Sequence, residues 1–268
     1  MIFATDLDRT LIYAERFLEG YDQDTLNIEV FKEKPISYIS SKALRLLKEL
    51  DKVATVIPIT TRNREQYKRI SIWGEHIEPR IYVVNNGGTI FIEGKEDLIW
   101  NEKIKQQLSV LTLSYEEVLR LFLSFYKGPI ERYKKSDELI WVVLGDKNHM
   151  DWEAIKDFQR QVEGAGWKID VNGRKIYLYP TCIRKWEALR YIKMNYLNEE
   201  VLAAGDSLFD VEMIHQAEFG VVPKGASIEE RCRENIYCTN RGGIGAAEDI
   251  LSYALEKVHA LKDASKEA

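Results

Sequence analysis

The order of the apolar segments along the chain constrains its fold more than any other feature of the sequence. Short apolar runs alternate with segments of helical periodicity, and strand, helix, strand, helix, strand is the pattern of a parallel sheet with right-handed crossovers. We expect strands at 1–5, 53–59, 80–84, 200–204 and 220–222, and helices at 40–50, 65–73, 184–196, 210–216 and 245–259. The sequence therefore predicts an α/β fold with a parallel sheet, in which 220–222 is the last strand.

The segment from about residue 89 to residue 180 has a different character and interrupts this pattern. Helical periodicity at 115–126 and 152–162 is mixed with strand-like runs at 139–144, 168–171 and 174–179. The last two runs flank Asn172-Gly173, which predicts a β-hairpin. Helices mixed with consecutive strands are typical of an α+β module. We therefore predict a core domain formed by 1–88 and 181–268, with a second domain inserted at 89–180.

Charge, hydropathy and cysteine content disfavour several classes of protein. The net charge of -5 argues against a broad nucleic-acid surface, which needs Lys and Arg concentrated on one face. No apolar stretch reaches the roughly 18 residues that cross a bilayer, and the first residues lack the pattern of a signal peptide. Cys182, Cys232 and Cys238 are odd in number and lack CxxC spacing, which disfavours a disulfide framework and a zinc site. We expect a cytoplasmic protein without a nucleic-acid or membrane partner, and the sequence leaves its oligomeric state open.

A pair of carboxylates follows the first expected strand. In a parallel sheet, ligands lie outside the carboxyl ends of the strands, and side chains two positions apart leave a strand end on the same side. Asp6 and Asp8 have this spacing. One carboxylate can attack phosphorus while the other handles a proton, and both can share a cation. Taken alone, the motif is equally consistent with two turn carboxylates that cap backbone amides.

Three further motifs follow other expected elements. Thr60-Thr61-Arg62 offers a hydroxyl and backbone amides that suit a phosphoryl oxygen, or else an ordinary helix N-cap. Lys185 lies near a helix start, where a lysine is usually solvated. Asp206 and Asp210 add carboxylates after another strand; hard oxygen ligands favour magnesium, which assists phosphoryl transfer, but either residue could simply cap a helix. The order of the four motifs along the chain favours one shared site.

Together these motifs resemble those of the haloacid dehalogenase (HAD) superfamily of phosphatases, and more closely its branch that includes Cof-type enzymes and sucrose-phosphate phosphatases. The resemblance covers the whole chain in outline. It extends to Asn85-Asn86-Gly87, which is similar to the Glu-Asn-Gly at the cap hinge of that branch, and to the Gly-rich segment at 239–247. It implies a Rossmann-like parallel sheet in the core and a C2-type cap at 89–180.

The resemblance also implies a role for each motif residue. Asp6 and Asp8, with Thr10 in the third place, match the family motif DxDx(T/V), so Asp6 is the expected nucleophile and Asp8 the expected acid/base. The implied cofactor is Mg²⁺, and its site is expected to comprise Asp6, the backbone carbonyl of Asp8, Asp206 and, in support, Asp210. Contacts to the substrate and its phosphate are expected from Thr60, Thr61, Arg62, Lys185 and Asn86.

The function implied by the resemblance is hydrolysis of a small phosphate monoester through an aspartyl-phosphate on Asp6, with a sugar phosphate as the preferred substrate. A sugar phosphomutase and a non-catalytic ligand-binding module remain alternatives. Arg9, Thr61 and Phe209 depart from the family pattern without removing a charged catalytic group. In the cap, a basic cluster either meets a second anionic group of the substrate or forms a solvated face; its members are Arg132, Lys134 and Lys135.

Overall fold

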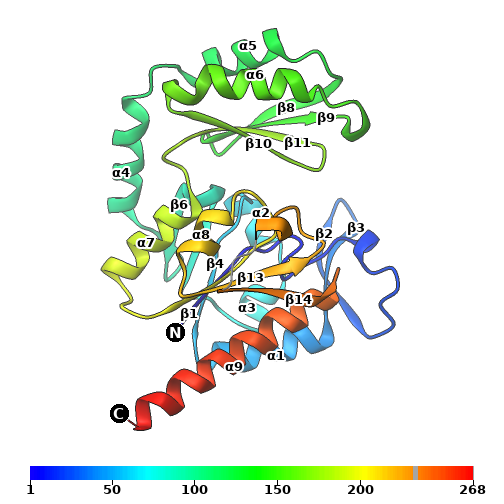
Figure 1. The fold of residues 1–268 in the computed structure, drawn as a ribbon, viewed down its shortest axis with the longest axis vertical. Coiled ribbons are helices and arrows are strands. Elements are labelled where there is room, and N and C mark those ends of the chain that lie inside the picture. The colour runs from blue at the N-terminus through cyan, green and yellow to red at the C-terminus, as the bar shows by residue number, and fades with distance from the viewer. Residues whose placement is uncertain (232–234, 268) are drawn as a thin grey trace.

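The computed structural model describes residues 1–231 and 235–267, and its largest sheet is parallel with five strands (Figure 1). The strand order is β14-β13-β12-β1-β4, and every ladder in this sheet is parallel. The strands are β1 (Ile2–Thr5), β4 (Thr55–Pro58), β12 (Val201–Ala204), β13 (Phe219–Lys224) and β14 (Ile236–Gly242). The predicted α/β fold is confirmed. The prediction that 220–222 is the last strand was wrong, because β14 follows it.

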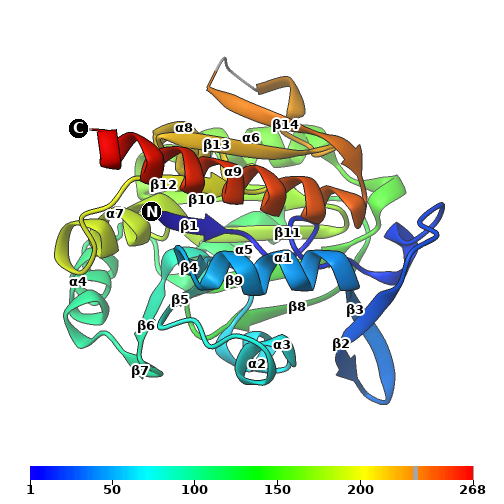
Figure 2. The same ribbon diagram turned by 90° about the horizontal axis from the view of Figure 1, so that it is seen from below.

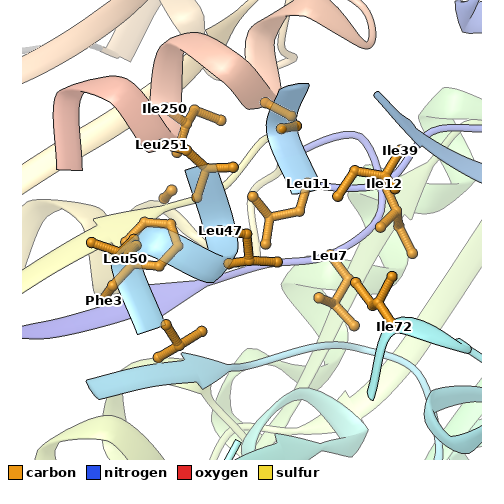
Figure 3. Close-up of a cluster of buried hydrophobic side chains, with 14 of the residues drawn as sticks. Phe3, Leu7, Leu11, Ile12, Ile39, Leu47, Leu50, Ile72, Ile250 and Leu251 are labelled. Carbon is orange, nitrogen blue, oxygen red and sulfur yellow. The ribbon is translucent and has the colours of Figure 1, made fainter. Parts of the chain in front are cut away.

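Helices cover both faces of this sheet, and the side chains of β1 alternate between them. Phe3 packs with Leu47 and Leu251 of α1 (Ser41–Asp51) and α9 (Gly245–Glu267), which lie side by side in Figure 2 and supply part of the cluster in Figure 3. Ile2 and Ala4 instead join the cluster that includes residues of α7 (Lys185–Asn195) and α8 (Val211–Gln216). This alternation buries the side chains of β1 on both faces of the sheet. The residues that follow β1 lie at the carboxyl end of the sheet.

The segment between β1 and α1 folds into elements that the apolar pattern does not predict. A short 3-10 helix, η1 (Glu15–Phe17), precedes the antiparallel hairpin of β2 (Thr25–Phe31) and β3 (Lys34–Ser40). The hairpin turns through Lys32 and Glu33, both at positive φ. Because neither residue is the Gly or Asn that usually marks such a turn, the sequence gives no hairpin signal here.

The segment between β4 and residue 98 also differs from expectation. The helix expected at 65–73 is two short helices, α2 (Arg64–Lys68) and α3 (Ile72–Glu75), with Gly74 at φ 89° inside the second. The strand expected at 80–84, β5 (Ile81–Val84), touches the parallel sheet through one bridge, Ile59 to Val83. Its ladder is antiparallel, with β6 (Thr89–Ile92), which then pairs with β7 (Lys95–Glu96); η2 (Asn85–Gly87) connects β5 and β6.

A second, antiparallel sheet lies above the first in Figure 1, in the order β10-β11-β9-β8. One face carries two helices that pack on Val143, Ile176 and Leu178. The hairpin predicted at 168–179 is present, although its turn falls at Gly173-Arg174. The elements of this region are α4 (Leu98–Ser109), α5 (Tyr115–Phe125), β8 (Ile130–Ser136), β9 (Ile140–Gly145), η3 (Lys147–His149), α6 (Trp152–Val162), η4 (Glu163–Ala165), β10 (Trp167–Asn172) and β11 (Lys175–Pro180).

The remaining sequence predictions concern cysteines and membrane segments. Cys182 is a free thiol, Cys238 is half-buried, and Cys232 lies outside the described residues. Within 1–231 and 235–267, no helix has both the length and the apolar character that crossing a membrane requires.

Candidate active site

Lys185 links two of the predicted carboxylates at the carboxyl end of the parallel sheet. Its ammonium donates to Oδ1 of Asp6 at 2.5 Å and to Oδ1 of Asp210 at 2.6 Å, and its side chain is 0% exposed. Asp6 itself follows β1 and is fixed by its backbone N–H, which donates to the carbonyl of Ala204 at 2.9 Å. Lys185 is therefore buried, and the alternative that it is a solvated lysine near a helix start was wrong.

The loop after β12 supplies the other carboxylates. Oδ2 of Asp210 accepts hydrogen bonds from the backbone N–H and the hydroxyl of Ser207, at 3.0 and 2.7 Å, so both of its oxygens are engaged. Within the part of the chain that the structure describes, Oδ2 of Asp206 is buried without a hydrogen-bond donor, and its ion-pair partner is Arg9 at 3.4 Å. A Cβ on Gly205 would lie 2.3 Å from Cβ of Asp210, so only glycine fits at this turn.

Asp6, Asp206 and Asp210 form a buried group of like charges that suits a divalent cation. One oxygen from each carboxylate lies within 4.8 Å of the others. Burial raises the pKa of Asp6 well above its usual range, Lys185 opposes that shift, and the neighbouring carboxylates add to it. Burial and the charge of Asp210 likewise raise the pKa of Asp206 to about 7. The three carboxylates offer hard oxygen donors and carry more negative charge than Lys185 balances. Together with the open oxygen of Asp206, these properties fit Mg²⁺.

Asp8 does not belong to this group and is held by Arg62. Nε and Nη2 of Arg62 donate to the two carboxylate oxygens of Asp8 at 2.7 and 2.8 Å, a bidentate pair. Burial raises the pKa of Asp8, but the charge and hydrogen bonds of Arg62 outweigh it, so the net pKa is lowered. The Asp8 side chain is 50% exposed. Its carboxylate is not in the three-residue group, and its predicted backbone contact to the metal stays a prediction.

Arg62 is held in turn by a residue that the sequence analysis missed. Its Nη1 donates to Oε2 of Glu29 at 2.7 Å. Glu29 lies on β2, is 2% exposed, and also accepts hydrogen bonds from Arg69 at 3.1 Å and from the hydroxyl of Ser37 at 2.7 Å. A single glutamate in a polar segment carries no sequence signal, so tertiary structure alone reveals this contact.

Thr60 and Thr61 lie beside these groups but do not cap a helix. The hydroxyl of Thr60 accepts a hydrogen bond from the backbone N–H of Arg62 at 3.1 Å, and Thr60 is fully buried. The N-cap of α2 is Asn63, so the N-cap alternative for Thr60 and Thr61 was wrong. Thr61 hydrogen-bonds the hydroxyl of Tyr177, which belongs to β11 in the second sheet.

Asn86 lies in η2, which connects β5 and β6. It is 1% exposed, its amide donates to the carbonyl of Ile183 at 3.2 Å, and its Oδ1 has no hydrogen-bond partner among the described residues. A Cβ on Gly87, at φ 101°, would lie 2.3 Å from the carbonyl oxygen of Arg184. The turn before β6 therefore lies in direct contact with the residue that precedes α7.

Two residues that depart from the family pattern contact the second sheet. Phe209 is 8% exposed and packs against Tyr177 and Tyr179, with ring centroids 5.1 and 5.3 Å away. Arg9, at φ 66°, donates to Oδ1 of Asn172 at 3.0 Å, at the end of β10. Both side chains thus connect the loops of the site to the sheet above them.

The basic cluster predicted in the cap is divided between two faces of that sheet. Arg132 and Lys134 alternate with Lys135 along β8, so they point to the opposite face. Lys135 forms ion pairs with Glu116 and Glu138 at 3.0 and 3.1 Å. The strand register places Arg132 on the same face as Lys175, which lies near Asp8: burial lowers the pKa of Lys175, and the charge of Asp8 opposes that shift.

A cavity of about 190 Å³ borders the buried carboxylate of Asp206. Its walls combine charged and aromatic side chains: Arg9, Tyr13, Phe17 and Lys224. The cavity reaches one of the three grouped carboxylates, which gives a small ion or solvent access to it.

Comparison with solved structures places this fold among known phosphatases and hydrolases. A sucrose-phosphatase from Synechocystis sp., solved with sucrose and phosphate, matches with a TM-score of 0.70 and 14% identity over 95% of this chain and 97% of the other. A HAD/COF-like hydrolase from Plasmodium vivax matches with a TM-score of 0.60 and 13% identity over 95% of both chains. An Aspergillus fumigatus trehalose-6-phosphate phosphatase gives 0.53 and 17%, over 94% and 91%. At these identities the likeness shows the fold alone.

Comparison with curated protein sequences found no match. The family model for haloacid dehalogenase-like hydrolases matches residues 82–247, which is more than half of the chain. This range contains Lys185, Asp206 and Asp210, and the carboxyl end of β1 adds Asp6 beside them. The chain belongs to the haloacid dehalogenase-like hydrolase family.

Proposed function

We propose that the protein is a Mg²⁺-dependent phosphatase that hydrolyses a small phosphate monoester through an aspartyl-phosphate on Asp6. The buried group of Asp6, Asp206 and Asp210, held by Lys185, carries this proposal. Three buried carboxylates beside one ammonium are costly for a scaffold to maintain, whereas they suit a site that binds a cation and a phosphoryl group.

In the first half of the reaction, a carboxylate oxygen of Asp6 attacks phosphorus as the bond to the leaving oxygen breaks. This step needs Asp8 in its protonated form, which Arg62 disfavours because it lowers the pKa of Asp8. The protonated Asp8 gives its proton to that oxygen, so the alcohol leaves neutral. In the second half, Asp8 takes a proton from the water that attacks the phosphorus of the aspartyl-phosphate, and inorganic phosphate is released. Lys185 and the hydroxyl of Thr60 orient phosphoryl oxygens. Asp6 and Asp206, supported by Asp210, would hold Mg²⁺, which would supply charge that offsets repulsion between carboxylate and phosphate.

The substrate we propose is a sugar phosphate, with residues 89–180 acting as a C2-type cap over its leaving group. The contacts of Phe209 with Tyr177 and of Arg9 with Asn172 support this role, since they join the second sheet to the loops of the site. Closing such a cap excludes water and restricts access to small molecules. The names of the sucrose- and trehalose-phosphate phosphatases with this fold support the choice of a sugar phosphate.

The test is phosphate release from a panel of sugar, polyol and nucleotide monophosphates, with and without Mg²⁺. We expect release that requires Mg²⁺ and that Asp6→Asn abolishes, while Asp22→Asn, a change at an exposed carboxylate, leaves it intact. Product that retains its phosphate at a new position would identify a phosphomutase. No turnover of any compound, together with measurable binding, would identify a ligand-binding module instead.

A further inference from the structure

We propose that Glu29 is a positioning residue for the reaction: it fixes Arg62, and Arg62 in turn holds Asp8 where it can protonate the leaving group. This inference rests on the proposed function, because it presupposes that Asp8 is the acid/base of the reaction. Glu29 lies 21 positions after Asp8 on the β2–β3 hairpin, outside every motif of the sequence analysis.

The contacts of Arg62 leave its guanidinium one orientation. Nε and Nη2 face Asp8, while Nη1 donates to Glu29 at 2.7 Å and to the backbone carbonyl of Gln66 at 3.3 Å. Its side chain is 11% exposed. Because all three nitrogens are engaged, the guanidinium cannot rotate to face Asp8 with a different pair of nitrogens without breaking its contact to Glu29.

The surroundings of Glu29 fix it as firmly as it fixes Arg62. Its side chain is fully buried, and both oxygens are used: Oε1 accepts from Arg69, and Oε2 accepts from Arg62 and from the hydroxyl of Ser37. A buried carboxylate needs such partners, because an unpaired one costs several kcal/mol. The β2–β3 hairpin therefore contacts Arg62 through two side chains, Glu29 at 2.7 Å and Ser37 at 3.4 Å.

Asp8 depends on Arg62, which supplies the hydrogen bonds that its carboxylate accepts. Its side chain is 50% exposed, and it precedes Arg9, which has a positive φ. A general acid must lie within hydrogen-bond reach of the leaving oxygen, and a displacement of about 1 Å can cost about 100-fold in rate. When the phosphorus–oxygen bond breaks, the proton passes from the Asp8 carboxyl to the leaving oxygen; a misplaced Asp8 leaves that oxygen to depart as an anion.

The experiment compares wild type with Glu29→Gln on a series of substituted phenyl phosphates whose leaving groups differ in pKa. An acidic phenol departs without a proton, whereas a weakly acidic one needs it. We expect kcat/KM to fall by about 10- to 100-fold for the least acidic leaving group and by less than about 3-fold for p-nitrophenyl phosphate. A plot of log kcat/KM against leaving-group pKa should thus become steeper in Glu29→Gln.

Glu248 provides a matched control. Its side chain is also 0% exposed, and it accepts hydrogen bonds from Ser40 at 2.7 Å, from Arg241 at 2.8 Å and from Tyr21. None of these partners contacts Asp8 or Arg62. Glu248→Gln should lower stability by a similar amount but leave the slope of the plot at the wild-type value. A merely structural role for Glu29 would lower all rates equally and also leave the slope unchanged.

Ser37→Ala tests the same idea with a smaller change, in case Glu29→Gln does not fold. It removes the hydroxyl that donates to Glu29 and lies 3.4 Å from Nη2 of Arg62. A steeper slope in either folded variant supports the proposal. Slopes parallel to wild type in both would overturn it while leaving the phosphatase assignment intact, whereas a wild-type protein that cleaves none of the phenyl, sugar, polyol or nucleotide phosphates would overturn both.

Discussion

Removing the ammonium of Lys185 should destabilise the protein far more than removing a lysine that forms an equally short but exposed ion pair. In Lys185→Met, Asp6 and Asp210 lose a partner at 2.5 and 2.6 Å in a site where the lysine is 0% exposed. Breaking a buried pair in this way costs about 3–5 kcal/mol, because it leaves carboxylates buried and unpaired.

Lys193 on the same helix is the matched control. It pairs with Glu218 at 2.6 Å, but the two side chains are 27% and 38% exposed. Exposed pairs contribute about 0–1 kcal/mol, so Lys193→Met should have almost no effect. The two substitutions share residue type, helix and bond length, and differ in burial and in the number of carboxylates that lose a partner.

The assay is urea unfolding followed by circular dichroism, with EDTA present so that no divalent cation occupies the carboxylates. We expect the midpoint to fall in Lys185→Met by an amount equivalent to about 4 kcal/mol, and a second change, Asp210→Asn, to recover part of the loss. Equal and small effects of Lys185→Met and Lys193→Met would refute the reasoning, because they would mean that the buried carboxylates are not charged in the folded protein.

Two further predictions concern the loop after β12 and the start of α4. Gly205→Ala should destabilise the protein by about 1–3 kcal/mol, because the added Cβ would lie 2.3 Å from Cβ of Asp210. Gly164→Ala should be neutral in thermal melts, because the Cβ added there has nothing within 4 Å. Similar melting temperatures for the two variants would contradict this prediction. Burial raises the pKa of Asp97, but hydrogen bonds from Tyr196, Trp100 and Tyr191 lower it more, so its net pKa is below the usual value. Its contribution to stability is therefore present above the usual carboxyl pKa and is lost as the pH falls through the lowered one. The stability difference between wild type and Asp97→Asn should accordingly shrink as the pH falls from about 5 to about 2. A constant difference across that range would contradict the lowered pKa of Asp97.

The parts of the fold that the sequence predicted are those with strong local patterns. β1 and β12 are four-residue apolar runs buried on both faces, and α6 follows its apolar period from residue 152 to residue 162. The β2–β3 hairpin and β14 were missed because they are polar along much of their length. Such strands are stabilised by backbone pairing with neighbouring strands. The neighbour is either distant in sequence or reached through a turn that carries no sequence signal, so the residues of the strand itself do not reveal the pairing.

The sequence by itself determined which residue types could serve a phosphoryl-transfer site, through the spacing of Asp6 and Asp8 and the position of Asp206 after a strand. Tertiary structure alone decided how they are divided: Asp6 joins Asp206 and Asp210 around Lys185, while Asp8 turns toward Arg62 and, through it, toward Glu29. The physical reason is that burial and charge pairing act between side chains brought together from β1, β2, α7 and the loops of the sheet. A linear pattern records which groups are present, but only the folded chain sets the distances at which they attract or repel.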